Sequence, residues 1–183
     1  MSYFYVGATN DIQSEADREA FRAIEGCLAQ TYGVAVRELA LPPVDFAFDH
    51  RRNQYSSIAV LEMLAELCPG DGGKLLAVTG RDLFIPVLTF VYGQAQLDGR
   101  LGLVSLARLR QEFYGLPHDR EILIHRARKE ALHETGHLFG LVHCMERSCA
   151  MSLSTGVWQI DSKNDAYCAP CAARARRKPM ELM

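Results

Sequence analysis

The chain has 183 residues, of which 49% are apolar and 23% charged, and its formal net charge is -2 at pH 7. This length is enough to bury one hydrophobic core, and the composition is typical of a globular protein rather than a disordered chain. The small net charge excludes bulk attraction to nucleic acid or anionic lipid, and no apolar run is long enough to span a membrane.

The first half of the chain predicts strands that alternate with helices. Ser14 is expected to cap the first helix and Gly33 to end it. The second helix is expected to bury one face, formed by Ile58, Leu61, Leu64 and Ala65. In chain order we expect a strand over residues 3–9, a helix over 14–31, a strand over 34–41 and a helix over 52–67.

The second half predicts three strands followed by a long helix. Asp98-Gly99 is a favoured hairpin turn, so the strands on either side of it should pair. Asp119 is expected to cap the long helix. The expected strands cover residues 75–79, 90–96 and 101–106, the helix covers 119–141, and its buried stripe is Leu123, Ala127, Ala131, Thr135 and Leu138.

This order of elements predicts an α/β (α+β) fold with a mixed, twisted sheet and three main helices. We expect a single domain over residues 1–183, with a sheet-and-helix part at about 1–141. The part at about 142–183 is rich in Cys, Ser, Gly and Asp, so we expect little regular structure there. Residues 1–10 contain no basic segment followed by an apolar one, which predicts a cytoplasmic protein without a secretory signal.

The long third helix contains an HExxH sequence, His133-Glu134-Thr135-Gly136-His137. Residues i and i+4 lie one turn apart on the same face of a helix, so His133 and His137 can reach one zinc ion. Glu134 lies beside them, where its carboxylate can act as a general base toward water held by the metal.

Gly140 and His143 extend this sequence to HExxHxxGxxH. A continuous helix cannot direct both His133 and His143 at one ion, so the chain must turn between them. Gly140 allows that turn because glycine adopts positive φ without steric cost. The other histidines, His50, His118 and His125, have no such partners and are assigned no role.

Four of the six cysteines form a C-x4-C…C-x2-C pattern near the end of the chain, and they are Cys144, Cys149, Cys168 and Cys171. Four thiolates suit a tetrahedral structural zinc site. Disulfides are one alternative, but they require an oxidising compartment. The two remaining cysteines, Cys27 and Cys68, are expected to be small buried apolar residues.

A nucleic-acid-binding finger is the second alternative, because a short basic run follows the last cysteine. One such run supplies few phosphate contacts, so we expect a solvated tail and no nucleic-acid partner. The residues of this run are Arg174, Arg176, Arg177 and Lys178.

The segment from His133 to His143 resembles the zinc signature of the metzincin metallopeptidases. Cys149-Ala150-Met151-Ser152 resembles their Met-turn, in which Met151 would form an apolar floor beneath the metal without binding it. The cysteines narrow the resemblance to the archaemetzincins, although the sixteen residues between Met151 and Cys168 are one fewer than in that pattern. Other stretches that match are Arg52-Asn53-Gln54-Tyr55, Thr79-Gly80-Arg81-Asp82-Leu83, Phe90-Val91-Tyr92-Gly93 and Ser105-Leu106-Ala107-Arg108-Leu109.

The resemblance implies a zinc-dependent peptidase with one catalytic zinc ion on the histidines and one structural zinc ion on the cysteines. It also implies that the strand at residues 90–96 is an edge strand that pairs with an extended peptide substrate. We expect a monomer, and the sequence does not predict which residues bind the substrate. A zinc-loaded binding protein with little catalysis is the alternative, because Leu153 stands where some metzincins have a tyrosine that assists the oxyanion.

Overall fold

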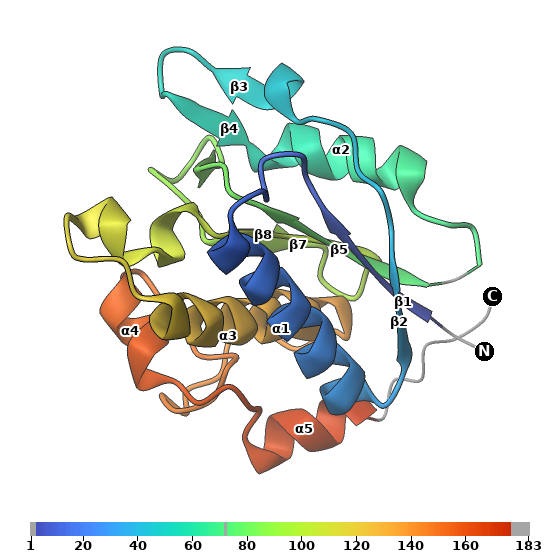
Figure 1. Cartoon of the computed structure of the whole chain (residues 1–183). Coiled ribbons are helices and arrows are strands. Elements are labelled where there is room, and N and C mark those ends of the chain that lie inside the picture. The colour runs from blue at the N-terminus through green and yellow to red at the C-terminus, as the bar shows by residue number, and fades with distance from the viewer. Residues whose placement is uncertain (1–2, 72, 177–183) are drawn as a thin grey trace.

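The computed structural model describes residues 3–71 and 73–176. A five-stranded sheet with the order β2-β1-β5-β8-β7 forms its centre (Figure 1). The first four of these strands run parallel, and β7 pairs antiparallel with β8 at the edge. The bounds are Tyr3–Ala8 for β1, Ala35–Glu38 for β2, Lys74–Thr79 for β5, Gly93–Ala95 for β7 and Leu101–Ser105 for β8.

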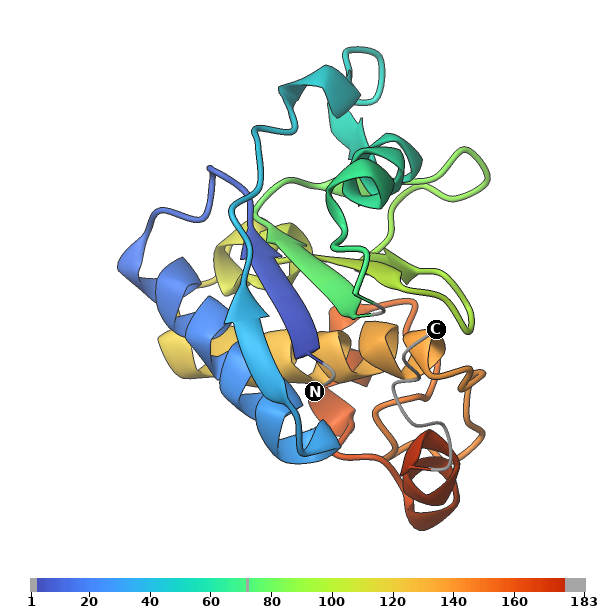
Figure 2. The same cartoon turned by 90° about the vertical axis from the view of Figure 1, so that its right-hand side faces the viewer.

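Three long helices cover the two faces of this sheet. Helices α1 and α3 lie on one face and α2 lies on the other (Figures 1 and 2). A second, smaller sheet with the order β3-β4-β6 adjoins α2. The bounds are Glu15–Tyr32 for α1, Ser57–Leu67 for α2, Arg120–Leu138 for α3, Phe48–Asp49 for β3, Gln54–Ser56 for β4 and Leu83–Phe84 for β6.

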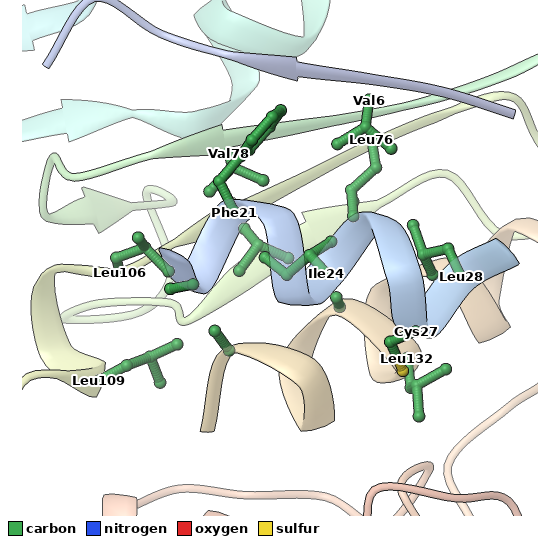
Figure 3. Close-up of a cluster of buried hydrophobic side chains, with 14 of the residues drawn as sticks. Val6, Phe21, Ile24, Cys27, Leu28, Leu76, Val78, Leu106, Leu109 and Leu132 are labelled. Carbon is green, nitrogen blue, oxygen red and sulfur yellow. The ribbon is translucent and has the colours of Figure 1, made fainter. Parts of the chain in front are cut away.

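The apolar run of β5 is continuous because both of its faces are covered. Alternate side chains of a strand point to opposite faces. Leu76 and Val78 therefore pack with α1 and α3, whereas Leu75 and Ala77 pack with α2. In the larger of these cores, side chains of α1 such as Ile24 lie between the strands and α3 (Figure 3).

The structure confirms the predicted helix signals. The Ser14 hydroxyl oxygen accepts a hydrogen bond from the Asp17 amide at 3.1 Å, and Gly33 ends α1 with φ at 64°. Asp119 accepts one from the Ile122 amide at 3.0 Å at the start of α3. The predicted apolar stripe of α3 is buried along its whole length. These signals are local, which explains why the sequence alone reveals them.

The second helix and the hairpin strands differ from the prediction. Helix α2 begins at Ser57 rather than residue 52, because residues 54–56 form β4 and pair with β3 and β6. Ile58 is 40% exposed and Ala65 is also exposed, so the buried face consists instead of Ser57, Val60, Leu61 and Leu64. The strand predicted over 90–96 is shortened to β7.

The C-terminal part is more regular than the sequence suggested. It contains two short helices, α4 (Val157–Ser162) and α5 (Ala169–Arg176), and the chain around them lies beneath α3 (Figure 2). Arg177 and Lys178 of the basic run lie outside the described residues. The described residues also contain three short 3-10 helices, at Asp45–Ala47, Ala107–Leu109 and Gln111–Tyr114. Within the described ranges, no helix is long and apolar enough to cross a membrane.

The core of α1 gives a direct test of this packing. Leu28 is completely buried, so Leu28→Ala should leave a cavity and lower the free energy of unfolding by about 2–5 kcal/mol. Leu67, at the end of α2, is 37% exposed, and Leu67→Ala should cost clearly less. Urea denaturation of both variants measures the difference, and equal losses would contradict the observed position of α1.

Candidate active site

The end of helix α3 brings the HExxH residues and His143 together. The helix stops at Leu138, three residues before the predicted end, and Gly140 adopts φ of 76°. The Gly140 amide donates to the His137 carbonyl at 2.9 Å, and the Leu141 amide donates to the Gly136 carbonyl at 3.0 Å. This left-handed turn reverses the chain, and His143 thereby returns to the face that carries His133 and His137.

The three imidazole rings surround one point. Their centroids are 4.8 to 5.2 Å apart, and a potential ligand nitrogen of each ring lies within 4.8 Å of the others. The Nε2 atoms of His133 and His137 are 3.3 Å apart. Two nitrogens bound to a tetrahedral zinc ion at about 2.05 Å would be separated by about 3.3–3.4 Å, so this donor set fits zinc.

Backbone carbonyls determine which nitrogen of two histidines faces this point. His133 Nδ1 lies 2.9 Å from the Ala150 carbonyl oxygen, and His137 Nδ1 lies 2.8 Å from that of Leu141. A carbonyl can only accept, so each Nδ1 carries the proton and each Nε2 keeps a free lone pair. These contacts fix the tautomer and the ring orientation, as is usual for histidine ligands.

The surroundings of the three rings favour their neutral form, although only His133 is fully buried and His143 is exposed. Burial lowers the pKa of His133 to about 3, with a further contribution from the positive charge of Lys163. Burial also lowers the pKa of His137 and of His143. Neutral imidazoles bind a metal ion at neutral pH without first losing a proton.

Glu134 is 5% exposed and lies against the edge strand β7. A Cβ atom on Gly93 would lie 2.6 Å from Glu134 Cγ and 2.7 Å from Oε1, so only glycine lets the strand approach this closely. Burial raises the pKa of Glu134 well above its ordinary value, Glu130 raises it further, and Lys163 opposes the rise. A divalent cation on the histidines would also favour the carboxylate form.

Met151 is completely buried, and its sulfur lies against Gly136. Gly136 occupies a wildcard position of HExxH between His133 and His137. Its missing side chain therefore lets the methionine pack under the helical turn that carries both histidines. The pattern HExxH does not reveal this requirement, because it depends on a segment fifteen residues further along the chain.

The four clustered cysteines also converge. Their sulfur atoms lie within 4.8 Å of one another, and those of Cys144 and Cys168 are 3.8 Å apart. Zinc–sulfur bonds of about 2.3 Å at the tetrahedral angle give about 3.8 Å. Burial raises the pKa of Cys149 and of Cys171, whereas a backbone hydrogen bond from Cys171 lowers that of Cys168. A cation at the centre would stabilise the thiolate form of all four cysteines. The Cys168 amide donates to Cys149 Sγ at 3.3 Å.

The remaining histidines and the two isolated cysteines lie outside both clusters. His50, His118 and His125 are exposed, and His118 Nδ1 lies 2.6 Å from Glu112 Oε1. Cys27 is buried, whereas Cys68 is only partly buried.

Sequence reasoning missed a set of buried charges on α3. Arg126 is 4% exposed and forms two hydrogen bonds of 2.6 and 2.7 Å with Asp161. Lys129 donates to the carbonyls of Ile160 and Asp161, both at 3.1 Å. Arg126 and Lys129 lie close in sequence to the buried residues of α3. Charged residues in a helix nevertheless face solvent more often than they are buried, so the sequence does not predict their burial. Only the position of α4 against α3 shows that they are buried.

A model of peptidase family M54 matches residues 39–177 of the chain. The archaemetzincin of Methanocaldococcus jannaschii is 42% identical over 134 residues, which cover 72% of this chain and 73% of that protein. The crystal structure of archaemetzincin from Methanopyrus kandleri superposes with a TM-score of 0.84 at 31% identity, covering 96% of this chain and 94% of that one. A zinc-dependent peptidase from Methanocorpusculum labreanum superposes with a TM-score of 0.80 at 29% identity, covering 93% and 99%.

Replacing Gly136 by alanine tests the packing beneath the histidines. The added Cβ would collide with the Met151 sulfur, so Gly136→Ala should destabilise the protein by about 1–3 kcal/mol despite the better helix propensity of alanine. Gly26, within α1, has no heavy atom within 4 Å of such a Cβ. Gly26→Ala should therefore raise stability by about 0.5–1 kcal/mol. Thermal melts of the two variants should shift in opposite directions, and a shift in the same direction would refute the contact.

Proposed function

Because the chain belongs to the archaemetzincin family of metallopeptidases, we propose that it hydrolyses peptide bonds at a zinc ion held by His133, His137 and His143. The observation that carries this proposal is the convergence of three neutral imidazoles beside one buried carboxylate, Glu134. The spacing of their nitrogens suits tetrahedral zinc with one position left open, which is the arrangement of catalytic rather than structural zinc sites.

His133, His137 and His143 would hold the zinc ion, which would supply a Lewis acid for the scissile carbonyl and a water molecule of lowered pKa. Glu134 would take the proton of the attacking water and later deliver it to the leaving amine. Its burial against Gly93 holds the carboxylate in one place next to the histidines. The Nδ1 contacts of His133 and His137 keep both rings oriented without movement during the reaction.

The edge strand β7 is the proposed guide for an extended peptide. Among the described strands it pairs only with β8, so its other side has no strand partner. Gly93 on β7 touches Glu134, which places the strand next to the general base. A peptide that added to this edge through backbone hydrogen bonds would pass beside the catalytic carboxylate.

The second zinc ion is proposed to be structural and to bind Cys144, Cys149, Cys168 and Cys171. Four sulfurs close the coordination sphere and leave no position for substrate. The Cys144 amide donates to the Met151 carbonyl at 2.9 Å, so this site also holds the segment that packs beneath α3. The alternative of a zinc-loaded binding protein rests on Leu153, which has no hydroxyl, but the intact Glu134 favours the enzyme.

Purified protein should contain two zinc ions per chain, because two separate ligand sets of the right spacing are present. Elemental analysis of protein prepared without chelators measures this. Treatment with a chelator should abolish peptide cleavage, and adding zinc back should restore it. One metal ion or none in carefully handled protein would contradict the proposal for at least one of the sites.

Glu134→Ala should lower peptide cleavage by about 10²–10⁴-fold and leave the zinc content unchanged, because the carboxylate serves the water and not the metal. Glu121 lies exposed on the same helix, and Glu121→Ala should leave both quantities unchanged. Cleavage of a responsive peptide and zinc content are measured on the same samples. Substantial activity of zinc-loaded Glu134→Ala would remove this residue from the mechanism, whereas loss of zinc would assign it a supporting role.

A further inference from the structure

Lys163 is a buried cation directly beneath the candidate catalytic site. Its side chain is 1% exposed, and it follows the last residue of α4. The ammonium lies 3.3 Å from the Ala150 carbonyl oxygen and 3.7 Å from Glu130 Oε1. Glu130 is itself 3% exposed, and this oxygen has no hydrogen-bond partner. Lys163 is therefore the cation that compensates a buried carboxylate one helical turn before Glu134.

The Ala150 carbonyl has a second donor. His133 Nδ1–H donates to the same oxygen at 2.9 Å, and this contact determines the tautomer of the first histidine ligand. Ala150 also lies between Cys149, one of the four cysteines, and Met151, which packs under α3. One carbonyl oxygen thus joins the histidine site, the methionine segment and the buried ammonium.

We propose that Lys163 is a positioning residue for the catalytic zinc site. Lys163 holds the Ala150 carbonyl in place for His133, and Glu130 holds Lys163. The inference rests on the proposed zinc site at the three histidines. In the described part of the chain, the contacts of the Lys163 ammonium are with the Ala150 carbonyl and Glu130 and not with an imidazole nitrogen. The positioning effect passes through one carbonyl oxygen and one imidazole ring, in the way that outer contacts of a ligand tune metal affinity. The positive charge of Lys163 also acts on the site directly, because it lowers the pKa of His133 and opposes the rise in the pKa of Glu134.

An apolar pair of similar size could fill the same space. Replacing a buried ion pair by well-packed apolar residues is often neutral or stabilising, so stability alone does not explain Lys163 and Glu130. What an apolar pair cannot supply is a hydrogen-bond donor to the Ala150 carbonyl. A variant that replaces both charged residues by apolar ones should therefore keep its stability but no longer hold the Ala150 carbonyl in place.

The experiment compares three variants with the wild type. Lys163→Met removes the ammonium, and Lys163→Met/Glu130→Met removes the whole ion pair, so that Glu130 does not stay buried without its partner. Lys129→Met is the matched control, because Lys129 is also a buried lysine that donates to carbonyls of the α4 segment, but not to Ala150. The zinc affinity of the histidine site is measured by competition with a chelator while the cysteine site keeps its metal. Melting temperature, kcat and KM are measured alongside.

We expect Lys163→Met to weaken zinc binding at the histidine site by about 10–100-fold, the usual cost of losing an outer contact of a ligand. The double variant should melt close to the wild type but retain the weak zinc binding. Lys129→Met should lose stability and keep wild-type zinc affinity. In zinc-saturated protein, kcat should fall in both Lys163 variants while KM changes little, because substrate contacts are untouched.

The inference is overturned if the double variant binds zinc as tightly as the wild type, or if Lys129→Met loses as much affinity as Lys163→Met. Should Lys163→Met fail to fold, the double variant decides the question alone, since it leaves neither Lys163 nor Glu130 buried without the other. A wild type that binds zinc only at the cysteines would instead refute the proposed function, so the two failures are distinguishable.

Discussion

The site depends on one constraint, which is that helix α3 is covered both by the sheet with α1 and by the C-terminal segment. The sheet and α1 cover one side through Leu123, Ala127 and Ala131, and the C-terminal segment covers another through residues such as Ile160 and Met151. A helix in this position has few directions left in which a polar side chain can reach water. Every polar or charged residue on its covered faces must therefore find a partner within the protein.

The paired charges of α3 follow from this constraint. Arg126 binds Asp161, Lys129 binds carbonyls at the end of α4, and Glu130 faces Lys163. Because an unpaired buried charge costs several kcal/mol, these contacts specify where the C-terminal segment lies on α3. The same segment carries Ala150 and Met151 to the histidines. Among these three pairs, only that of Lys163 and Glu130 also contacts the Ala150 carbonyl, which accepts a hydrogen bond from His133.

Two glycines allow close packing around the histidines and Glu134. Gly93 lets the edge strand approach Glu134, and Gly136 lets Met151 approach the helix. A side chain at Gly93 would collide with Glu134, and one at Gly136 would collide with the Met151 sulfur. The histidine and cysteine clusters also share one segment of chain. Residues 143–151 contain members of both clusters and Ala150, whose carbonyl contacts His133.

The amino-acid sequence by itself determined the local features of this protein. The i, i+4 spacing of His133 and His137, the turn at Gly140 and the caps Ser14 and Asp119 depend on neighbours within one or two helical turns. Such interactions are readable from spacing alone. The cysteine pattern was readable for the same reason, because two short-range pairs limit the geometry that they can adopt.

The tertiary structure alone decided which charges are buried and where α2 begins. The start of α2 depends on the pairing of β4 with β6, and the role of Lys163 depends on α4 packing against α3. These contacts join residues about thirty positions apart or more. Periodicity within one segment carries no information about them, since a charged residue on a helix looks the same in sequence whether water or another segment covers it.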